Sequence, residues 1–511
     1  MQSSTLGILL VMIIYLVGMI LIGLMMAKKN ENVSDFYLGG RKLGPFVTAM
    51  SAEASDMSSY LLMGLPGLAY ISGVADVGWT AIGLAVGTYL NWLIVAKPLR
   101  RYTEHTKSIT IPDFFSNRYG DDKRVLMLIA AIIIIIFFVP YTGSGFAACG
   151  KLFSSLFHVD YHKAMIISAI VIIVYTTLGG FLAASTTDFL QSIIMTIALI
   201  VIMFFGISVA GGMGAVIDNA KQLPGYLSLS QTYDAVSGTA SPYGPITILS
   251  TCAWGLGYFG MPHILLRFMA IEDDEKLTLS RRVASIWVVI SMGVAILIGI
   301  IGLAMSAKGV IPVLEGNNSE TIIVEISSFL SQHGILAAVV AGIVLSGILA
   351  ATMSTADSQL LAASSSVTQN ILQEFFHVNM TPKKMMNVAR LSLLGIAVIG
   401  VVSAWNPDSS VFQIVSFAWA GVGASFGPIV LLALFWRRSN RYGALAGLIT
   451  GGAMVFIWKY LVRPIGGAWN IYELLPAFIL AIVVNVIVSL ATPAPEKAVT
   501  DVFDEVKAMN R

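Results

Sequence analysis

Long apolar segments separated by short polar ones run through the whole chain. A membrane-spanning helix needs about 20 mostly apolar residues to cross roughly 30 Å of hydrocarbon, and on that basis the sequence predicts about thirteen spans. They are Leu6–Met26, Phe46–Ile71, Val77–Ala96, Val125–Phe157, Ala164–Leu178, Leu190–Ala210, Ile246–Met269, Val283–Met305, Ile335–Ala363, Val388–Trp405, Val411–Phe435, Ala444–Leu461 and Leu474–Leu490. The fourth is long for one crossing, and we expect it to tilt or bend near Pro140.

Basic residues are distributed unequally between the two sides that these spans define. If successive loops alternate sides, all but six of the 30 Lys and Arg residues fall on one side, Arg41, Arg267 and Arg437 among them. The six exceptions are Lys151, Lys163, Lys221, Lys308, Lys459 and Arg463. Because basic loops stay cytoplasmic, we expect an outer N-terminus, a cytoplasmic C-terminus and a multi-pass protein of the plasma membrane, the bacterial inner membrane.

The second predicted span contains polar residues that a lipid-facing helix avoids. Its segment 50–60 reads Met-Ser-Ala-Glu-Ala-Ser-Asp-Met-Ser-Ser-Tyr, and Gly64 and Pro66 follow. A charged side chain at mid-membrane costs at least about 2.5–3.5 kcal/mol, so such residues usually face a site or a partner. Asp56 is therefore a candidate functional residue or the partner of a buried Arg or Lys, whereas the serines are equally well explained as small packing residues.

The seventh span is interrupted as well. Residues 254–262 read Trp-Gly-Leu-Gly-Tyr-Phe-Gly-Met-Pro, and Trp254, Tyr258 and Pro262 share one helical face. Irregular backbone at membrane depth is tolerated where it lines a cavity or is buried in protein, so binding and core packing are both consistent with this stripe. Two interrupted segments five spans apart indicate an inverted five-plus-five repeat over spans two to eleven.

The repeat divides the chain, which we interpret as a single transmembrane domain over residues 1–511. Its parts are a first helix and loop (1–45), the inverted-repeat core (46–436), two extra helices (437–491) and a cytoplasmic tail (492–511).

The ninth span carries hydroxyl groups on one face, where Ala351, Ser354, Thr355 and Ser358 follow helical spacing. Beside the carbonyls of a broken helix, two hydroxyls would complete a small oxygen cage without formal charge. Hard cations prefer oxygen ligands, and a monovalent ion needs no carboxylate cage. The alternative is hydrogen bonding of each hydroxyl to its own helix.

The amino-acid composition excludes several classes of protein. The chain is 57% hydrophobic and 11% charged with a net charge of +2, whereas soluble domains are about 25% charged. This excludes a soluble multi-domain enzyme, a disordered protein and a nucleic-acid binder. No nucleophile–base pair indicates an enzyme, and nothing indicates an obligatory protein partner. An intramembrane enzyme would have only the pair Glu53 and Asp56, and a transporter-like sensor would usually carry a signalling domain.

Several segments resemble the sodium:solute symporter family, and its proline-transporting branch most closely. They are Thr176–Ala183 (TTLGGFLA), Ala433–Arg438 (ALFWRR) with Gly443–Gly451, and Ser51–Ser58 (SAEASDMS) with Leu61–Gly67. The resemblance extends over essentially the whole chain. It implies an all-α polytopic membrane protein with a leucine-transporter-like fold, sodium as the co-transported ion, and L-proline or a similar small solute as the substrate.

The resemblance also implies roles for particular residues. The sodium ligands would be backbone carbonyls of Ala54, Met57 and Ala351 with the hydroxyls of Ser354 and Thr355. Residues linked to coupling would be Asp56, Arg41 and Asp188, of which the last two lie near the cytoplasmic ends of spans. The proline pocket would be lined by Ser58, Tyr60, Tyr141, Trp254, Tyr258 and Pro262.

One position departs from the pattern of the proline branch. Ser59-Tyr60 stands where that branch carries Gly-Trp after the Asp-Met-Ser run. Tyrosine keeps an aromatic wall but adds a hydroxyl and loses ring area. The same fold carrying another solute, such as a sialic acid, pantothenate or another amino acid, is therefore the alternative.

Overall fold

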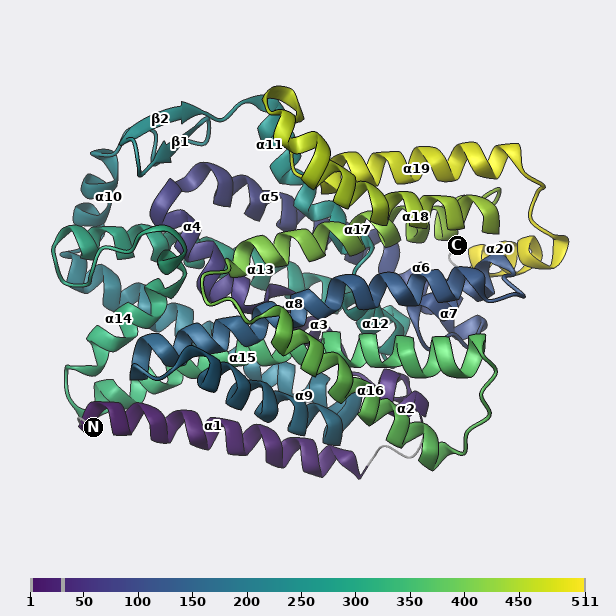
Figure 1. The fold of residues 1–511 in the computed structure, drawn as a ribbon, viewed down its shortest axis with the longest axis horizontal. Helices are drawn as coiled ribbons and strands as arrows, with labels where there is room; N and C mark the ends of the chain where they lie inside the picture. The colour runs from purple at the N-terminus through teal and green to yellow at the C-terminus, as the bar shows by residue number, and fades with distance from the viewer. Residues whose placement is uncertain (1–2, 29–32, 510–511) are drawn as a thin grey trace.

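The computed structural model describes residues 3–28 and 33–509 and is built almost entirely of helices (Figure 1). Most of the long helices run side by side along the longest axis of the molecule, with α1 beginning at one end and α20 at the other.

The α-helices are α1 (Ser3–Ala27), α2 (Val33–Leu38), α3 (Pro45–Ser59), α4 (Leu65–Ser72), α5 (Val74–Leu90), α6 (Ala96–His105), α7 (Ile111–Tyr119), α8 (Val125–Phe157), α9 (Tyr161–Ala210), α10 (Met213–Lys221), α11 (Pro245–Cys252), α12 (Pro262–Ala270), α13 (Leu277–Ala307), α14 (Ile322–Ser331), α15 (Ile335–Ser365), α16 (Pro382–Ser403), α17 (Val411–Phe435), α18 (Arg441–Ile457), α19 (Leu474–Ala491) and α20 (Lys497–Met509). A hairpin of β1 (Gln231–Asp234) and β2 (Thr239–Pro242), paired antiparallel, lies between α10 and α11.

Among the described residues, ten helical stretches are long and apolar enough to cross a membrane. The structure thus confirms a polytopic helical protein, and the count of thirteen spans stays a prediction. Both α8 and α17 have the predicted bounds, with Pro140 inside α8. The ten stretches do not include the predicted second and seventh spans, and the predicted fifth and sixth spans lie together in α9.

The fifth and sixth predicted spans form one 50-residue element that folds back on itself. On a straight helix Tyr175 and Ala198 would lie about 35 Å apart. Both nevertheless pack against one short stretch of α15: the Tyr175 hydroxyl donates to the Met353 carbonyl at 3.1 Å, and a Cβ added to Gly347 would lie 2.7 Å from the Ala198 Cβ. The reversal occurs at Gly180, whose φ of 63° and ψ of −162° suit a residue without a Cβ.

The second and seventh predicted spans are broken, as their glycines and prolines indicate. The second consists of α3, the π-helical turn η2 (Tyr60–Gly64) and α4, and the seventh of α11, the 3-10 segment η4 (Ala253–Phe259) and α12. Helix α12 packs against α3, and η4 packs against α5 and α17. The two broken spans therefore meet inside the bundle.

Helix α15 lies at the centre of the bundle, in contact with α1, α3, α8 and α9. Every residue of α15 from Val344 to Ser365 is buried, so its polar residues face protein on all sides. The C-terminal helices α18 and α19 pack on each other and on α17 at the edge of the bundle (Figure 1).

Candidate functional site

The break in the second span is a strained turn at Ser58. Its φ of 50° and ψ of −168° lie in a region that is essentially restricted to glycine, and a non-glycine residue there costs of order 1–3 kcal/mol. The Ser58 Oγ accepts the backbone N–H of Tyr60 at 3.1 Å. Such strain persists only where the surrounding structure holds it in place, and it marks functional sites more often than ordinary helix packing.

Directly before this break, α3 contacts the hydroxyl face of α15. The Ser354 hydroxyl donates to the Ala54 carbonyl at 2.8 Å and also approaches the Ala351 carbonyl at 3.1 Å. The Thr355 hydroxyl lies 3.3 Å from the same Ala351 carbonyl. The structure therefore brings together four of the five residues proposed as cation ligands. The fifth, Met57, is buried one turn further along α3, and its carbonyl accepts the backbone N–H of Tyr60.

The Asp56 side chain contacts the other broken span. The Tyr258 hydroxyl of η4 donates a short hydrogen bond to the Asp56 carboxylate, and the Tyr258 carbonyl accepts from Asn91 at 2.9 Å. Asp56 thus ties the two interrupted spans together. The neighbouring carboxylate of Glu53 is bound through Oε1 by Thr88 and Trp92, at 3.1 and 3.0 Å.

An aromatic cavity adjoins Asp56. It is lined by Asp56, Met57, Tyr60, Leu84, Tyr141, Trp254, Val415 and Trp419. The rings of Tyr60 and Trp254 are stacked with centroids 5.7 Å apart, and the Trp419 indole donates to the Trp254 carbonyl at 2.8 Å. With a volume of about 10 Å³, the cavity has room for a single water. A solute of amino-acid size would require these rings to separate.

Three of the residues expected in the pocket do not line this cavity. Ser58 forms the turn, Tyr258 binds Asp56, and Pro262 begins α12 as its first residue. All three are buried in the described structure. The lining residues that the sequence did not indicate are Leu84, Val415 and Trp419. Trp419 lies in a mostly small and apolar predicted span, where nothing distinguishes it.

Phe412 packs on two of the rings that line the cavity. Its ring lies 6.0 Å from Tyr60 and 5.8 Å from Trp254, and it also lines a wide vestibule of about 710 Å³. The backbone amide of Phe412 donates to Glu320 at 3.2 Å, and Glu320 pairs with Lys151 at 2.8 Å. Phe412 therefore lies between the vestibule and the rings of Tyr60 and Trp254, and Glu320 binds the start of α17, which carries Phe412.

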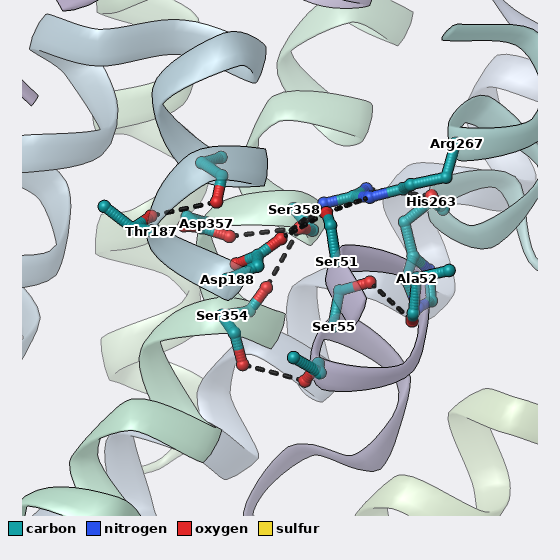
Figure 2. Close-up of polar contacts among 12 residues, drawn as sticks. Ser51, Ala52, Ser55, Thr187, Asp188, His263, Arg267, Ser354, Asp357 and Ser358 are labelled. Atoms are coloured by element: carbon teal, nitrogen blue, oxygen red, sulfur yellow. Dashed lines mark hydrogen bonds and ion pairs between the residues drawn. The ribbon is translucent and has the colours of Figure 1, made fainter. Parts of the chain in front are cut away.

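A buried ionic network lies near Ser354 (Figure 2). Arg267 of α12 pairs with Asp188 of α9 at 3.0 Å, and both side chains are at most 1% exposed. The same guanidinium donates to Ser51 at 2.9 Å and to Ser358 at 2.6 Å. Ser51 also donates to Asp188 at 2.7 Å. The network joins α3, α9, α12 and α15.

This network corrects the sequence-based sorting of basic residues in one place. Its position at the end of the predicted seventh span counts Arg267 with the loop residues, whereas the structure buries it in α12. Asp188, which the resemblance places near the cytoplasmic end of a span, is completely buried. The two residues are 79 positions apart in the sequence, so only their tertiary packing reveals the pair.

Arg41 lies in η1 (Gly39–Arg41), between the first and second spans. Its guanidinium donates to the Met269 carbonyl at 2.6 Å, to the Thr103 carbonyl at 3.0 Å and to the Ser108 carbonyl at 2.8 Å. Burial lowers the pKa of Arg41 to about 10, so the side chain remains charged at neutral pH. Arg41 therefore joins the end of α12 to the end of α6.

Known proteins share this sequence and this fold. The sequence profile described as the sodium:solute symporter family matches residues 36–451. The osmoregulated proline transporter OpuE of Bacillus subtilis is 40% identical over 486 residues, which cover 95% of each chain. The sodium/proline symporter of Escherichia coli is 40% identical over 499 residues, covering 97% of this chain and 95% of the relative.

Among solved structures, a Na⁺-coupled sialic acid symporter in a substrate-bound outward-open state superposes with a TM-score of 0.78 at 16% identity, covering 96% of this chain and 99% of the other. The closed, bromovinylhydantoin-bound form of Mhp1, a nucleobase-cation-symport-1 family transporter, gives a TM-score of 0.55 at 15% identity, covering 93% and 99%. At these identities the likeness shows the fold, which is the leucine-transporter-like five-plus-five arrangement. With its profile match and its relatives along nearly the full length, the chain belongs to the sodium:solute symporter family.

Proposed function

We propose that this protein is a sodium-coupled symporter that imports L-proline by alternating access. The observation that carries the proposal is the contact between the broken second span and α15, where Ser354 meets the Ala54 carbonyl at 2.8 Å next to an aromatic cavity. Relatives at 40% identity over nearly their full length are named as proline transporters, which supports proline as the solute. The protein is a transporter and not an enzyme.

The proposed sodium site consists of the carbonyls of Ala54, Met57 and Ala351 and the hydroxyls of Ser354 and Thr355. All five residues are at most 3% exposed, and all five ligands are neutral oxygens, which suit a monovalent hard cation. A sodium ion here would hold α3 against α15 immediately before the strained Ser58. Asp56 would act through geometry, because its hydrogen bond to Tyr258 fixes the second span against the seventh.

The proposed proline site comprises Ser58, Tyr60, Tyr141, Trp254, Tyr258 and Pro262. The stacked rings of Tyr60 and Trp254 offer an apolar surface for a pyrrolidine ring. Backbone ends of the two broken spans can bind the charged amine and carboxylate. Because the cavity holds only about 10 Å³ and Phe412 packs on its Tyr60 ring, binding requires an outward opening in which these rings move apart.

The proposed coupling residues Asp188 and Arg41 both touch the seventh span. Asp188 is bound to Arg267 of α12, and Arg41 binds the Met269 carbonyl of the same helix. When one bundle rocks against the other, these contacts must rearrange for the cytoplasmic side to open. At −100 mV the entry of one sodium contributes about 2.3 kcal/mol, before any concentration gradient.

The proposed location is the bacterial inner membrane, with the N-terminus outside and the C-terminus in the cytoplasm. Helix α20 packs on α6 and α7 at the end of the molecule opposite the start of α1. Arg101 and Arg437 pair there with Asp274 and Asp504. This basic end corresponds to the cytoplasmic side in the positive-inside rule.

The test is uptake of labelled L-proline into proteoliposomes that contain the purified protein. We expect accumulation with an inward sodium gradient and its loss when an ionophore collapses that gradient. Accumulation that is unaffected by the collapse would refute sodium coupling. Competition by unlabelled amino acids, sialic acid and pantothenate distinguishes proline from other solutes: a competitor that is more effective than proline would identify the alternative substrate.

A further inference from the structure

A deep apolar groove opens on the flank of the bundle, away from the proposed transport site. Helices α1 and α8 both pack on α9 and α15, and the groove lies between them with a volume of about 470 Å³. Its inner end is formed by Cys149, Leu349 and Met353, which are at most 2% exposed. Its outer edge includes Ile167, which is 63% exposed. The groove thus connects the lipid-facing surface with the protein interior.

The groove is as long as one leaflet of a bilayer is thick. Along α9 its lining runs from Lys163 to Ile172, a distance of about 14 Å at 1.5 Å per residue. Along α1 it runs from Thr5 to Leu16, which is about 16 Å. Half of a bilayer's hydrocarbon core is about 15 Å. A single acyl chain, which spans one leaflet in the bilayer, therefore matches the groove in length as well as in its apolar character.

A cation stands at the mouth of the groove. Lys163 is exposed, and no carboxylate among the described residues lies within ion-pair distance of its ammonium group. The neighbouring His162 packs on Trp405 at 4.5 Å, and Trp405 is 51% exposed. Exposed tryptophans mark the headgroup level of a bilayer. Lys163 is therefore placed where the phosphate of a lipid headgroup would lie.

We propose that this groove binds one acyl chain of an anionic phospholipid, with the headgroup phosphate at Lys163 and the chain end against Met353. The chain end would thereby contact the residue that precedes Ser354. The Met353 sulfur accepts from Tyr15 at 3.7 Å, and its carbonyl accepts from Tyr175 at 3.1 Å. The bound chain supports the segment of α15 that faces α3, independently of which solute the protein carries.

Photo-crosslinking tests the site directly. The full-length protein is placed in nanodiscs with phosphatidylglycerol that carries a diazirine at the end of one acyl chain, and labelled residues are mapped by mass spectrometry. We expect labels on Leu349 and Met353, which lipids on the outer surface of the protein do not reach. Labels confined to exposed residues such as Ile170, which is 53% exposed and outside the groove, would overturn the proposal.

Two pairs of variants test the chain and the headgroup separately. Val171→Trp fills the groove and should abolish labelling of Met353, whereas Ile170→Trp on the adjacent outer face should leave it unchanged. Lys163→Glu should reduce labelling at least fivefold, the change expected for one lysine near anionic headgroups, whereas Lys221→Glu should not.

The headgroup assignment has its own refuting outcome. In the unaltered protein, a phosphatidylcholine probe should label Met353 only weakly. We expect this labelling to be no stronger than that by the phosphatidylglycerol probe in the Lys163→Glu variant. Equal labelling by both probes in the unaltered protein would overturn the anionic assignment. Lys163→Glu is an exposed change that leaves the core packing intact, so its result does not depend on whether Val171→Trp folds.

Discussion

Neutralising Asp188 tests how far the buried ionic network holds the closed arrangement together. Asp188→Asn preserves the size of the side chain and removes the charge that faces Arg267 at 3.0 Å. Arg267 would keep its bonds to Ser51, Ser358 and the His263 carbonyl, but its charge would lose its closest partner. Because both side chains are at most 1% exposed, water cannot replace the lost interaction.

The expected magnitude follows from the contacts that are lost. Breaking a buried ion pair by removing one partner costs about 3–5 kcal/mol, and a hydrogen bond to a charged group contributes about 1.5–3 kcal/mol. Asp188 accepts its bonds from Arg267 and Ser51 through the same oxygen, and the amide oxygen of asparagine can still accept from both donors, so we expect a cost in the lower part of the range, about 3 kcal/mol. Removing both charges in Asp188→Asn/Arg267→Met should cost less than the sum of the single changes, with a coupling of about 1–3 kcal/mol.

Thermal unfolding of the purified variants in detergent, followed by size-exclusion chromatography, gives the stability order. We expect a clear fall in melting temperature for Asp188→Asn and for Arg267→Met, and a less than additive fall for the double variant. Thr187→Val is a matched control, because the Thr187 hydroxyl bonds only to the α9 backbone. Unchanged melting of Asp188→Asn, or additive effects in the double variant, would refute the reasoning.

Three further outcomes are expected. Thr355→Ala should raise the sodium concentration required for half-maximal uptake. Thr352→Ala should not, because the Thr352 hydroxyl bonds within its own helix at 2.9 Å. Equal sodium requirements of the two variants would exclude Thr355 as a ligand. Gly257→Ala places a Cβ 2.0 Å from the Trp419 indole nitrogen. The variant should lose uptake and about 1–3 kcal/mol of stability. Gly293→Ala should remain active, because open space surrounds Gly293. Burial raises the pKa of Asp113 in the short helix α7 from 3.8 to about 6. The stability contributed by protonated Asp113 is therefore full below about pH 4 and is lost as the pH rises through 6. Asp113→Asn should flatten the dependence of the melting temperature on pH over that window, and an unchanged profile would contradict the assignment.

The sequence was sufficient to predict the elements whose character is local. The bounds of α8 and α17 follow from long, mostly apolar segments between polar loops. The breaks near Ser58 and Gly257 follow from glycine, proline and polar residues within predicted spans. Helical spacing places Ser354 on one face of α15 together with Ala351, Thr355 and Ser358, and the structure shows that this face meets α3.

Features that depend on contacts between distant segments were not predictable in the same way. Arg267 lies close enough to the end of its span to be taken for a loop residue, and only the packing of α12 against α3 places it beside Asp188. Phe412 and Trp419 are ordinary apolar residues in sequence. Their importance arises because α17 packs on η4 and brings their rings to Tyr60 and Trp254.

The hydrogen bond from Ser354 to Ala54 has a consequence for cation binding. If both oxygens were to bind one cation, the 2.8 Å contact would have to lengthen and its net contribution, about 0.5–1.5 kcal/mol, would be lost. Thr355 makes only a 3.3 Å contact within its own helix, so its oxygen is available at a smaller cost. Removing the Thr355 hydroxyl therefore loses a ligand with little compensation, whereas Ser354→Ala loses a ligand and a competing bond together. We accordingly expect Thr355→Ala to raise the sodium concentration required for half-maximal uptake more than Ser354→Ala does. The reverse order would place the cation closer to Ser354.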